Sequence, residues 1–379
     1  MQIKPVDKIN VLQDDQRVVD QAVDETEVLV ETARGLHPSI FALAAKKEIP
    51  SFSIPSRTFS TGLMPWEIYD WVNRGKDPKK VTDLVLHDGM FAEDWFKDQD
   101  IAFIAEHFTN LRSIKFLTGS LSDSSMKELK KLPQLTSVWL SNHSSSFTDA
   151  GLYELALAVP KLGTLVLERL WDSVTGSMLD KTLQALPHLR SLRISEGSIP
   201  WPVLENSLQK SSITHLEFDR FDTGTGPEAM KVWRETFSAM KNLQSISLEA
   251  QEGTHARTML DSMSNIQKLN LYWTPIEPDQ ELPASLKCVK LDFTFEGAPL
   301  SVLVEKASRL PQLEVLAIGY WNQPANYENI DFAEHLANGF KALKEIRFDY
   351  PPEEVYGLIK RLKYLRPELK IYIDPYVNG

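Results

Sequence analysis

One six-residue pattern of hydrophobic positions recurs along most of the chain. It places apolar residues at its first, fourth and sixth positions, as in Leu189-Arg190-Ser191-Leu192-Arg193-Ile194. Copies of it begin at Val81, Leu111, Leu135, Leu162, Leu189, Ile213, Leu243, Ile266, Leu286, Leu313 and Leu343, and a degenerate last copy lies around Leu369. Such a pattern, when its period is in the twenties, predicts a solenoid in which each repeat packs against the next.

The chain alternates between strand-like and helix-like sequence. Within each copy, apolar and variable positions alternate as they do along a strand with one buried face. Between copies, apolar residues spaced by three and four predict helices over residues 150–159, 229–240, 300–310 and 332–340. Prolines that end a helix stand before the next strand at Pro133, Pro160, Pro187 and Pro311. Strand and helix in steps of this length predict a parallel sheet on the inside and helices on the outside.

The interval between the copies at Ile266 and Leu286 is an exception. It is the shortest interval between copies, and it contains Pro275, Pro278 and Pro283. Three prolines in so short a segment disfavour a helix, because proline lacks the backbone donor and clashes with the preceding turn. We therefore expect no full helix here, and a solenoid that is thin or bent at this point.

The segment before the first copy does not follow the pattern. Helical spacing of apolar residues is found within residues 14–44 and again in a short helix over residues 64–72. The two prolines of residues 49–56 predict an extended loop. Because the first strand of a solenoid would otherwise expose its core, we expect residues 1–80 to form a mainly helical N-terminal cap and residues 81–379 to form the repeat domain.

The most regular repeat reads Thr148-Asp149-Ala150-Gly151-Leu152-Tyr153-Glu154-Leu155-Ala156 and continues through Val159-Pro160-Lys161-Leu162 to Leu165-Val166-Leu167. Either Thr148 or Asp149 would cap the helix, because each side chain can accept a hydrogen bond from a free backbone amide. This repeat resembles those of ribonuclease-inhibitor-like and F-box leucine-rich repeat proteins, over roughly residues 81–373. The resemblance implies an α/β leucine-rich repeat solenoid, a right-handed horseshoe of about a dozen repeats. The Asn or Cys that these families carry after each strand is mostly missing here.

A second resemblance concerns Met64-Pro65-Trp66-Glu67-Ile68, which looks like the opening of an F-box. The resemblance implies a segment that docks an adaptor of a ubiquitin ligase. The family's F-box is a bundle of several helices, whereas only a short stretch separates this segment from the first strand at Val81. A plain cap helix and an adaptor-docking segment over residues 61–80 are therefore both open.

Composition narrows the range of partners and compartments. The chain has 41 basic and 52 acidic side chains and a formal charge of −11, which argues against nucleic acid as the main partner and favours basic protein surfaces. Its one cysteine, Cys288, allows neither an intrachain disulfide nor a thiolate metal cluster. No apolar signal segment is visible, and no apolar run approaches the length of a membrane span. These features predict a cytoplasmic protein that does not bind a membrane.

Sequence signatures of catalysis are missing. The chain contains no Gly-x-Ser-x-Gly motif, no His-Glu-x-x-His pair and no phosphate-binding Gly-Lys-Ser/Thr loop. The eight histidines are scattered singly from His37 to His335, whereas a metal needs several convergent ligands. We therefore predict a protein that is not an enzyme and needs neither cofactor nor metal.

The outward face of the expected sheet holds the candidate binding residues. Aromatic and arginine side chains on a rigid surface are typical of binding hot spots. The candidates are Trp139, Arg193, Asp219, Tyr272, Trp273, Lys290, Tyr320, Trp321 and Arg347. Carboxylates directly follow the strand motif at Glu168, Asp219, Glu249, Asp292 and Asp349, where they form either part of this surface or a solvated face.

These candidates predict a protein-binding scaffold or adaptor that uses the concave face of its sheet, through a large preorganised surface. Two alternatives remain open. One is an F-box-like substrate receptor of a ubiquitin ligase, and the other is a secreted bacterial effector of the same architecture that binds a host protein. The aromatic side chains could also fold over the edge of the sheet and pack on neighbouring loops, which would make them structural.

Overall fold

The computed structural model of the chain describes most of the repeat region. The described residues are 63–86, 96–117, 121–141, 147–168, 174, 177–195, 207–219, 227–249, 253–272, 274, 280–293, 309–321, 330–349 and 355–374. Residues 55–379 make up one compact unit. The helices expected within residues 14–44 and the loop expected at residues 49–56 lie outside the described residues.

Twelve β-strands of the described residues belong to one parallel sheet. They are β1 (Asp83–Leu86), β2 (Ser113–Phe116), β3 (Ser137–Ser141), β4 (Thr164–Glu168), β5 (Ser191–Ser195), β6 (His215–Asp219), β7 (Ser245–Glu249), β8 (Lys268–Tyr272), β9 (Cys288–Phe293), β10 (Val315–Trp321), β11 (Glu345–Asp349) and β12 (Lys370–Asp374). Each strand pairs with the next strand of the chain, so the order in the sheet is the order in the sequence. Each copy of the six-residue pattern therefore contributes one strand, as predicted.

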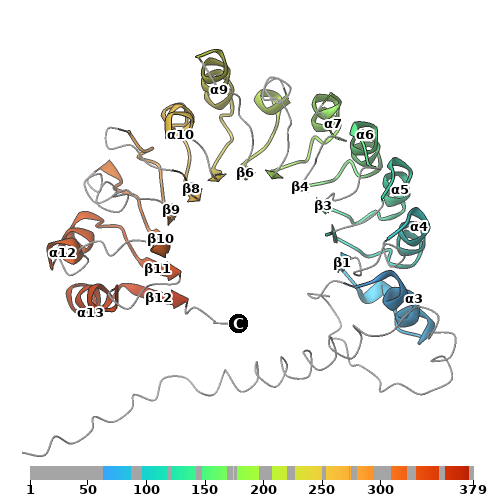
Figure 1. Cartoon of the computed structure of the whole chain (residues 1–379), viewed down its shortest axis with the longest axis horizontal. Coiled ribbons are helices and arrows are strands. Elements are labelled where there is room, and N and C mark those ends of the chain that lie inside the picture. The colour runs from blue at the N-terminus through green and yellow to red at the C-terminus, as the bar shows by residue number, and fades with distance from the viewer. Residues whose placement is uncertain are drawn as a thin grey trace, which may run out of the picture. The chain divides into compact units, whose positions relative to one another are not determined.

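Helices connect many of these strands. Those of the described residues are α3 (Pro65–Asn73), α4 (Asp98–His107), α5 (Asp123–Glu128), α6 (Asp149–Ala158), α7 (Leu179–Gln184), α9 (Pro227–Ala239), α10 (Gly253–Asp261), α12 (Ile330–Gly339) and α13 (Val355–Leu365). The strands of the repeat unit line its inner side and the labelled helices its outer side (Figure 1). The α/β solenoid fold is therefore confirmed.

Most of the individually predicted helices are found. The segments 150–159, 229–240 and 332–340 correspond to α6, α9 and α12, and the short helix expected at residues 64–72 is α3. Most of the segment 300–310 lies outside the described residues. The agreement follows from the spacing of apolar residues, because the same side chains that set the helical period are the ones that face the core.

The three apolar positions of the pattern form the core. In the repeat of β5, Leu189, Leu192 and Ile194 are at most 2% exposed. The residues between them turn to the other face of the sheet, because successive side chains along a strand point to opposite faces. Burying one leucine or isoleucine contributes about 1.5–3 kcal/mol. The pattern therefore stabilises the solenoid at every step.

The short interval after β8 contains no helix among its described residues. Thr274 is fully buried there, and its hydroxyl donates to the carbonyl oxygen of Tyr272 at 2.9 Å. A turn follows, in which the amide of Leu286 donates to the carbonyl oxygen of Pro283 at 3.1 Å. Residues 273 and 275–279 lie outside the described part of the chain.

The segment around α3 packs on the first repeat. The amide of Leu63 donates to the carbonyl oxygen of Val85 in β1 at 2.9 Å, on the side of β1 that does not face β2. The ring of Trp71 stacks on Phe108 with 5.9 Å between the ring centroids. These contacts join the segment around α3 to β1 and to Phe108, the residue after α4. The wider assignment of residues 1–80 as one cap stays a prediction.

A ladder of hydrogen bonds links the beginnings of successive helices. In each step, a carboxylate near the start of one helix accepts a hydrogen bond from a serine or threonine at the start of the next. The pairs are Asp98 with Ser122, Asp123 with Thr148, Asp149 with Ser177, and Asp180 with Ser207. The partners lie 24 to 28 residues apart, which is one repeat. The ladder therefore helps to fix how neighbouring repeats stack.

The helix cap predicted from the most regular repeat is part of this ladder. The hydroxyl oxygen of Thr148 accepts a hydrogen bond from the amide of Ala150 at 3.2 Å, so Thr148 caps α6. The same hydroxyl donates to the carboxylate of Asp123 at 2.7 Å. One side chain thus satisfies a free helix amide and also bonds to the preceding repeat.

Asp98 is the member of the ladder with the most donors around it. Its carboxylate accepts from the hydroxyls of Ser122, Ser124 and Ser125 at 2.5, 2.6 and 2.9 Å, and from the amide of Ser122 at 3.1 Å. Burial alone would raise the pKa of this carboxyl, but the donors outweigh burial and hold the pKa below its usual value. A carboxyl whose pKa is lowered by folding stabilises the protein above its unfolded-state pKa of about 4. That contribution is lost as the pH falls through the folded-state value.

Asp98→Asn is expected to lower the free energy of unfolding by about 1–2 kcal/mol at pH 7, because an amide has one acceptor oxygen where the carboxylate has two. Chemical denaturation at pH 7 and near pH 3 checks this. The two proteins should become more alike at the lower pH, which lies below the usual carboxyl pKa, because the unfolded wild-type chain takes up a proton at Asp98 there. Asp261→Asn, at an exposed ion pair, is the control and should change stability by less than about 0.5 kcal/mol. An Asp98→Asn deficit of equal size at both pH values would contradict the assignment.

Candidate functional site

The face of the sheet turned away from the helices carries a row of side chains that crosses all twelve strands. The register of the strands aligns the middle variable positions of successive repeats. From β1 to β12 the row is Val85, Lys115, Trp139, Val166, Arg193, Glu217, Ser247, Asn270, Lys290, Ala317, Arg347 and Tyr372. We call it the central row of the concave face. Because neighbouring strands lie about 4.8 Å apart, side chains of adjacent repeats can touch.

Trp139 on β3 lies between two cations of the central row. Nζ of Lys115 on β2 is 4.3 Å from the ring centroid, and the guanidinium carbon of Arg193 on β5 is 5.7 Å from it. Arg193 reaches the ring across β4, where the row holds the shorter Val166. Cations at such distances are attracted to the indole ring, by about 0.5–1 kcal/mol at exposed sites. The half-buried ring of Trp139 therefore has a defined position on the concave face.

The indole N–H of Trp139 is shielded from solvent and has no acceptor among the described residues. A buried donor without a partner costs about 1–3 kcal/mol. Packing and the two cations hold the ring in place despite this cost. A partner that moved the ring and supplied an acceptor would recover part of the free energy.

Arg193 is also the centre of an ion cluster. Its guanidinium lies 3.6 Å from Glu168, 3.4 Å from Glu217 and 3.6 Å from Asp219. These nitrogen–oxygen distances exceed the roughly 2.7–2.9 Å of a charge-assisted hydrogen bond. One cation is thus shared among three carboxylates by Coulomb attraction. The cluster is net negative, which suits a partner that presents a basic group.

Glu217 is the carboxyl most affected by this imbalance. Burial raises its pKa above the usual value, and Asp219 and Glu168 raise it further, whereas Arg193 opposes them. The raised pKa means that ionising Glu217 costs more in the folded chain than in the unfolded chain. An additional cation beside Glu217 would reduce that cost.

A second group of side chains lies between β8 and β11. Nζ of Lys290 on β9 is 2.8 Å from a carboxylate oxygen of Asp349 on β11 and 5.5 Å from the ring centroid of Tyr272 on β8. The bond to Asp349 spans β10, where the central row holds Ala317. As at Val166, a small side chain on the intervening strand lets a long cation reach across it.

Arg347 belongs to a third group at the end of the sheet. Its Nε is 2.5 Å from a carboxylate oxygen of Glu345 on the same strand. Its guanidinium carbon is 5.6 Å from the ring centroid of Tyr372 on β12. The predicted basic residues therefore lie in three separate groups along the concave face.

The structure places most of the predicted site residues on this face. Trp139, Arg193, Lys290 and Arg347 stand in the central row. Asp219 and Tyr272 stand in the next row, which runs Glu168, Ser195, Asp219, Glu249, Tyr272 and Asp292 from β4 to β9. The row of carboxylates expected after the strands thus exists as a row, interrupted by serine and tyrosine. The role of these residues in binding stays a prediction.

The remaining predicted aromatic residues lie in parts of the chain that are less fully described. Trp273 lies outside the described residues. Tyr320 and Trp321 belong to β10, beyond an irregularity in its pairing with β9, and only their backbone is described.

Three members of the central row that belong to these groups are not among the sequence-based candidates. Lys115, Glu217 and Tyr372 occupy the same central row as Trp139 and Arg193. Their position in the six-residue pattern is the signal that could have selected them. Residue type alone misses them, because a lysine or glutamate at one variable position looks like an ordinary surface residue.

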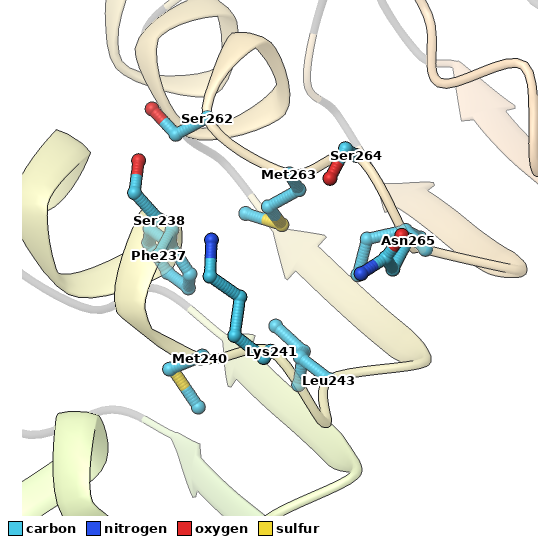
Figure 2. A pocket seen from close by; sticks show the side chains of 10 residues that line it. Phe237, Ser238, Met240, Lys241, Leu243, Ser262, Met263, Ser264 and Asn265 are labelled. Atoms are coloured by element: carbon cyan, nitrogen blue, oxygen red, sulfur yellow. The ribbon is translucent and has the colours of Figure 1, made fainter.

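A pocket lies at the turns between helices and strands, away from the concave face (Figure 2). It is lined by the end of α9 with the turn that follows, and by the turn after α10, including Phe237, Met240, Lys241 and Met263. Its volume is about 10 Å³, which is room for one water molecule at most. Small-molecule sites usually measure about 300–1,000 Å³, so this pocket does not suit such a ligand.

Metal and membrane-spanning sites are absent from the described part of the chain. It contains no group of three or more His, Cys, Asp or Glu residues positioned to hold a metal ion. None of the helices described is both long and apolar enough to cross a membrane. Cys288 is a free, half-buried thiol whose pKa is raised by burial.

Comparison with known proteins yields similarity in fold. No protein-family model matches the sequence, and none of the curated proteins is significantly similar to it. A chain in the crystal structure of the yeast Rad7–Elc1 complex is 14% identical, with 96% of this chain and 98% of that chain covered and a TM-score of 0.51. The leucine-rich repeat protein LegL7 from Legionella pneumophila is 18% identical. The match covers 78% of this chain and 90% of that chain, with a TM-score of 0.46. An internalin from Listeria monocytogenes is 14% identical, with 80% and 88% covered and a TM-score of 0.31.

These identities are too low to transfer an activity, and the likeness concerns the fold alone. The recurrent apolar pattern supplies one strand per repeat, and the strands pair in the order of the chain. Together, the pattern and the sheet show that this chain has the α/β solenoid fold of leucine-rich repeat proteins.

Proposed function

We propose that the chain is a scaffold or adaptor that binds another protein through its concave face. The observation that carries the proposal is the position of Trp139, held between Lys115 and Arg193 on a sheet of parallel strands. Tryptophan and arginine are the residue types most enriched among binding hot spots. The yeast chain of similar fold was crystallised in a complex of two proteins, which is consistent with this kind of role.

The concave face is suited to binding because its side chains are already ordered. Ion pairs and cation–ring contacts restrain Arg193, Lys290 and Arg347. Association usually costs about 0.5–1.5 kcal/mol for each side chain that must be immobilised. Side chains that are restrained before binding reduce this cost, so a partner gains more from the same contacts.

Affinity capture from a cell lysate tests the proposal, with the intact chain, Trp139→Ala and Leu157→Ala as baits. Leu157 is 53% exposed on the outer helix α6 and is the matched control. We expect Trp139→Ala to weaken retention of a specific partner by tenfold or more, as hot-spot residues do. Leu157→Ala should retain it, and circular dichroism verifies that all three chains are folded. Equal retention by Trp139→Ala and the intact chain would refute the site.

The alternative of a ubiquitin-ligase substrate receptor depends on what α3 does. The contacts of Leu63 with Val85 and of Trp71 with Phe108 join this segment to the repeats, which supports a structural role for it. Docking of an adaptor by residues 61–80 and a role as a secreted bacterial effector stay as predictions. The repeat fold is compatible with either of them.

The remaining expectations belong to the same proposal. We infer a protein that is not an enzyme, needs no cofactor and resides in the cytoplasm, with a protein partner rather than nucleic acid or a membrane. The formal charge of −11 and the net negative cluster around Arg193 support a partner with basic groups. The single cysteine supports a reducing compartment.

A further inference from the structure

Among the described strands, the last one, β12, has less deeply buried core positions than its neighbour β11. In β11, the core-facing Ile346 and Phe348 are fully buried. The equivalent residues of β12, Ile371 and Ile373, are both partly exposed. β12 is the last strand in the sheet order, with β11 as its one neighbour among the described strands. In the described part of the chain, β12 is thus an edge strand with partly exposed apolar side chains, a feature that native proteins usually cover.

Further exposed apolar surface lies in the same repeat. Among the described residues, four large hydrophobic side chains are exposed, and three of them, Tyr356, Tyr364 and Tyr372, belong to α13 and β12. The fourth is Leu157 on α6. Tyr372 stands in the central row of the concave face, and Tyr356 and Tyr364 stand on the outer helix, so exposed rings lie on both faces of this repeat.

Two copies of the β12 sequence are complementary to each other when they run antiparallel. The strand is Lys370-Ile371-Tyr372-Ile373-Asp374. An antiparallel partner strand of the same sequence, centred on Tyr372, sets Lys370 opposite Asp374, Ile371 opposite Ile373, and Tyr372 opposite itself. Cross-strand pairs of opposite charge and of β-branched residues stabilise such pairing.

We propose that this edge binds a second copy of the chain, with β12 pairing antiparallel to β12 of the other copy around a twofold axis at Tyr372. A twofold interface uses the same surface on both copies and therefore needs a self-complementary one. The pairing covers the core-facing side of Ile371 and Ile373 and continues the sheet from one copy into the other. α13 is bonded to α12 on one flank, through Arg361 and Glu334 at 2.6 Å. Its other flank then faces α13 of the second copy.

Sedimentation equilibrium of the full-length chain tests this inference, over concentrations that reach about 100 μM. The wild-type chain is expected to show twice the mass of one chain at the upper end. Lys370→Asp makes both ends of β12 acidic, and Asp374→Lys makes both ends of β12 basic. Each should therefore dimerise at least about tenfold more weakly, because like charges face each other twice in the dimer. Mixing the two variants restores opposite charges, and a heterodimer should form.

Lys161→Asp makes the same change of charge far from β12 and should leave the dimer intact. Circular dichroism establishes that every variant is folded. A wild-type chain that stays monomeric at the highest concentration would overturn the inference. So would a dimer that persists equally in both single variants, or two monomeric variants that fail to associate when mixed.

Discussion

Gly151→Ala is expected to lower the free energy of unfolding by about 3 kcal/mol, although alanine is normally the better helix former by about 1 kcal/mol. A methyl group at this position would clash with a carboxylate oxygen of Asp123 and would lie 2.9 Å from the ring of Phe147. Asp123 cannot move away without losing its bonds to the amide and hydroxyl of Thr148, at 2.8 and 2.7 Å. Overpacking costs about 1–3 kcal/mol and a lost hydrogen bond about 1 kcal/mol more.

The chain contains a matched control for this substitution. Gly357 occupies the third residue of α13, as Gly151 does in α6, but a methyl group there would meet nothing within 4 Å. Gly357→Ala is therefore expected to raise the free energy of unfolding by about 0.4–1 kcal/mol. Urea denaturation of both variants measures the difference. If both substitutions raised the free energy of unfolding, Gly151 would not be needed for the contact between Asp123 and Thr148.

Arg193→Ala is expected to lower the free energy of unfolding by about 2 kcal/mol at pH 7. The substitution leaves Glu168, Glu217 and Asp219 beside one another without their shared cation. Removing one partner of a buried ion pair costs about 3–5 kcal/mol, and the value here is smaller because the side chain of Arg193 is 30% exposed. The Trp139 ring also loses one of its two cations.

The pH dependence of this variant separates charge repulsion from lost packing. Burial raises the pKa of Glu217, and protonation of this carboxyl relieves its repulsion with Glu168 and Asp219, so the deficit of Arg193→Ala should shrink as the pH falls from 7 toward 5. Glu217→Gln removes one of the charges. Because folding raises the pKa of Glu217, its ionised form costs stability once the pH has risen above the usual carboxyl pKa. Glu217→Gln alone should therefore be neutral or slightly stabilising at pH 7.

In the Arg193→Ala background, Glu217→Gln should recover part of the lost stability. Chemical denaturation of the single and double variants at pH 7 and pH 5 measures both effects. A deficit that depends neither on pH nor on Glu217→Gln would mean that Arg193 acts mainly by packing.

The strands and four of the nine described helices, α3, α6, α9 and α12, could be predicted individually, because burial of apolar residues determines the spacing in both. Leu189, Leu192 and Ile194 and their equivalents are buried in each repeat. The same spacing of apolar residues therefore recurs along the sequence. Helix α6 also carries its own start signal in Thr148, whose cap is local and depends on residues two positions apart. By contrast, α10 (Gly253–Asp261) was not predicted, since its sequence lacks a clear proline stop or cap.

The groups on the concave face could be predicted only in part. Position in the pattern indicates that Trp139 and Arg193 point to the same side, but it does not indicate that they touch. That contact spans an intervening strand and depends on the small size of Val166. The bond from Lys290 to Asp349 depends on Ala317 in the same way. Such contacts are set by side-chain length and by which rotamers neighbouring repeats allow.

The hydrogen-bond ladder between helices also has a signal in the sequence. Asp98 and Ser122 are 24 residues apart, and Asp123 and Thr148 are 25 apart. A carboxylate and a hydroxyl that recur at the repeat period predict contacts between successive repeats, just as the apolar residues do.

Hydroxyl-radical footprinting tests most directly whether the concave face binds the partner. Oxidation of aromatic side chains would be compared between the free chain and its complex with the captured protein. We predict lower oxidation of Trp139 and Tyr272 in the complex. Oxidation of Tyr364, which is 77% exposed on the outer helix α13, should stay unchanged. Protection of Tyr364 with Trp139 and Tyr272 unchanged would contradict the account.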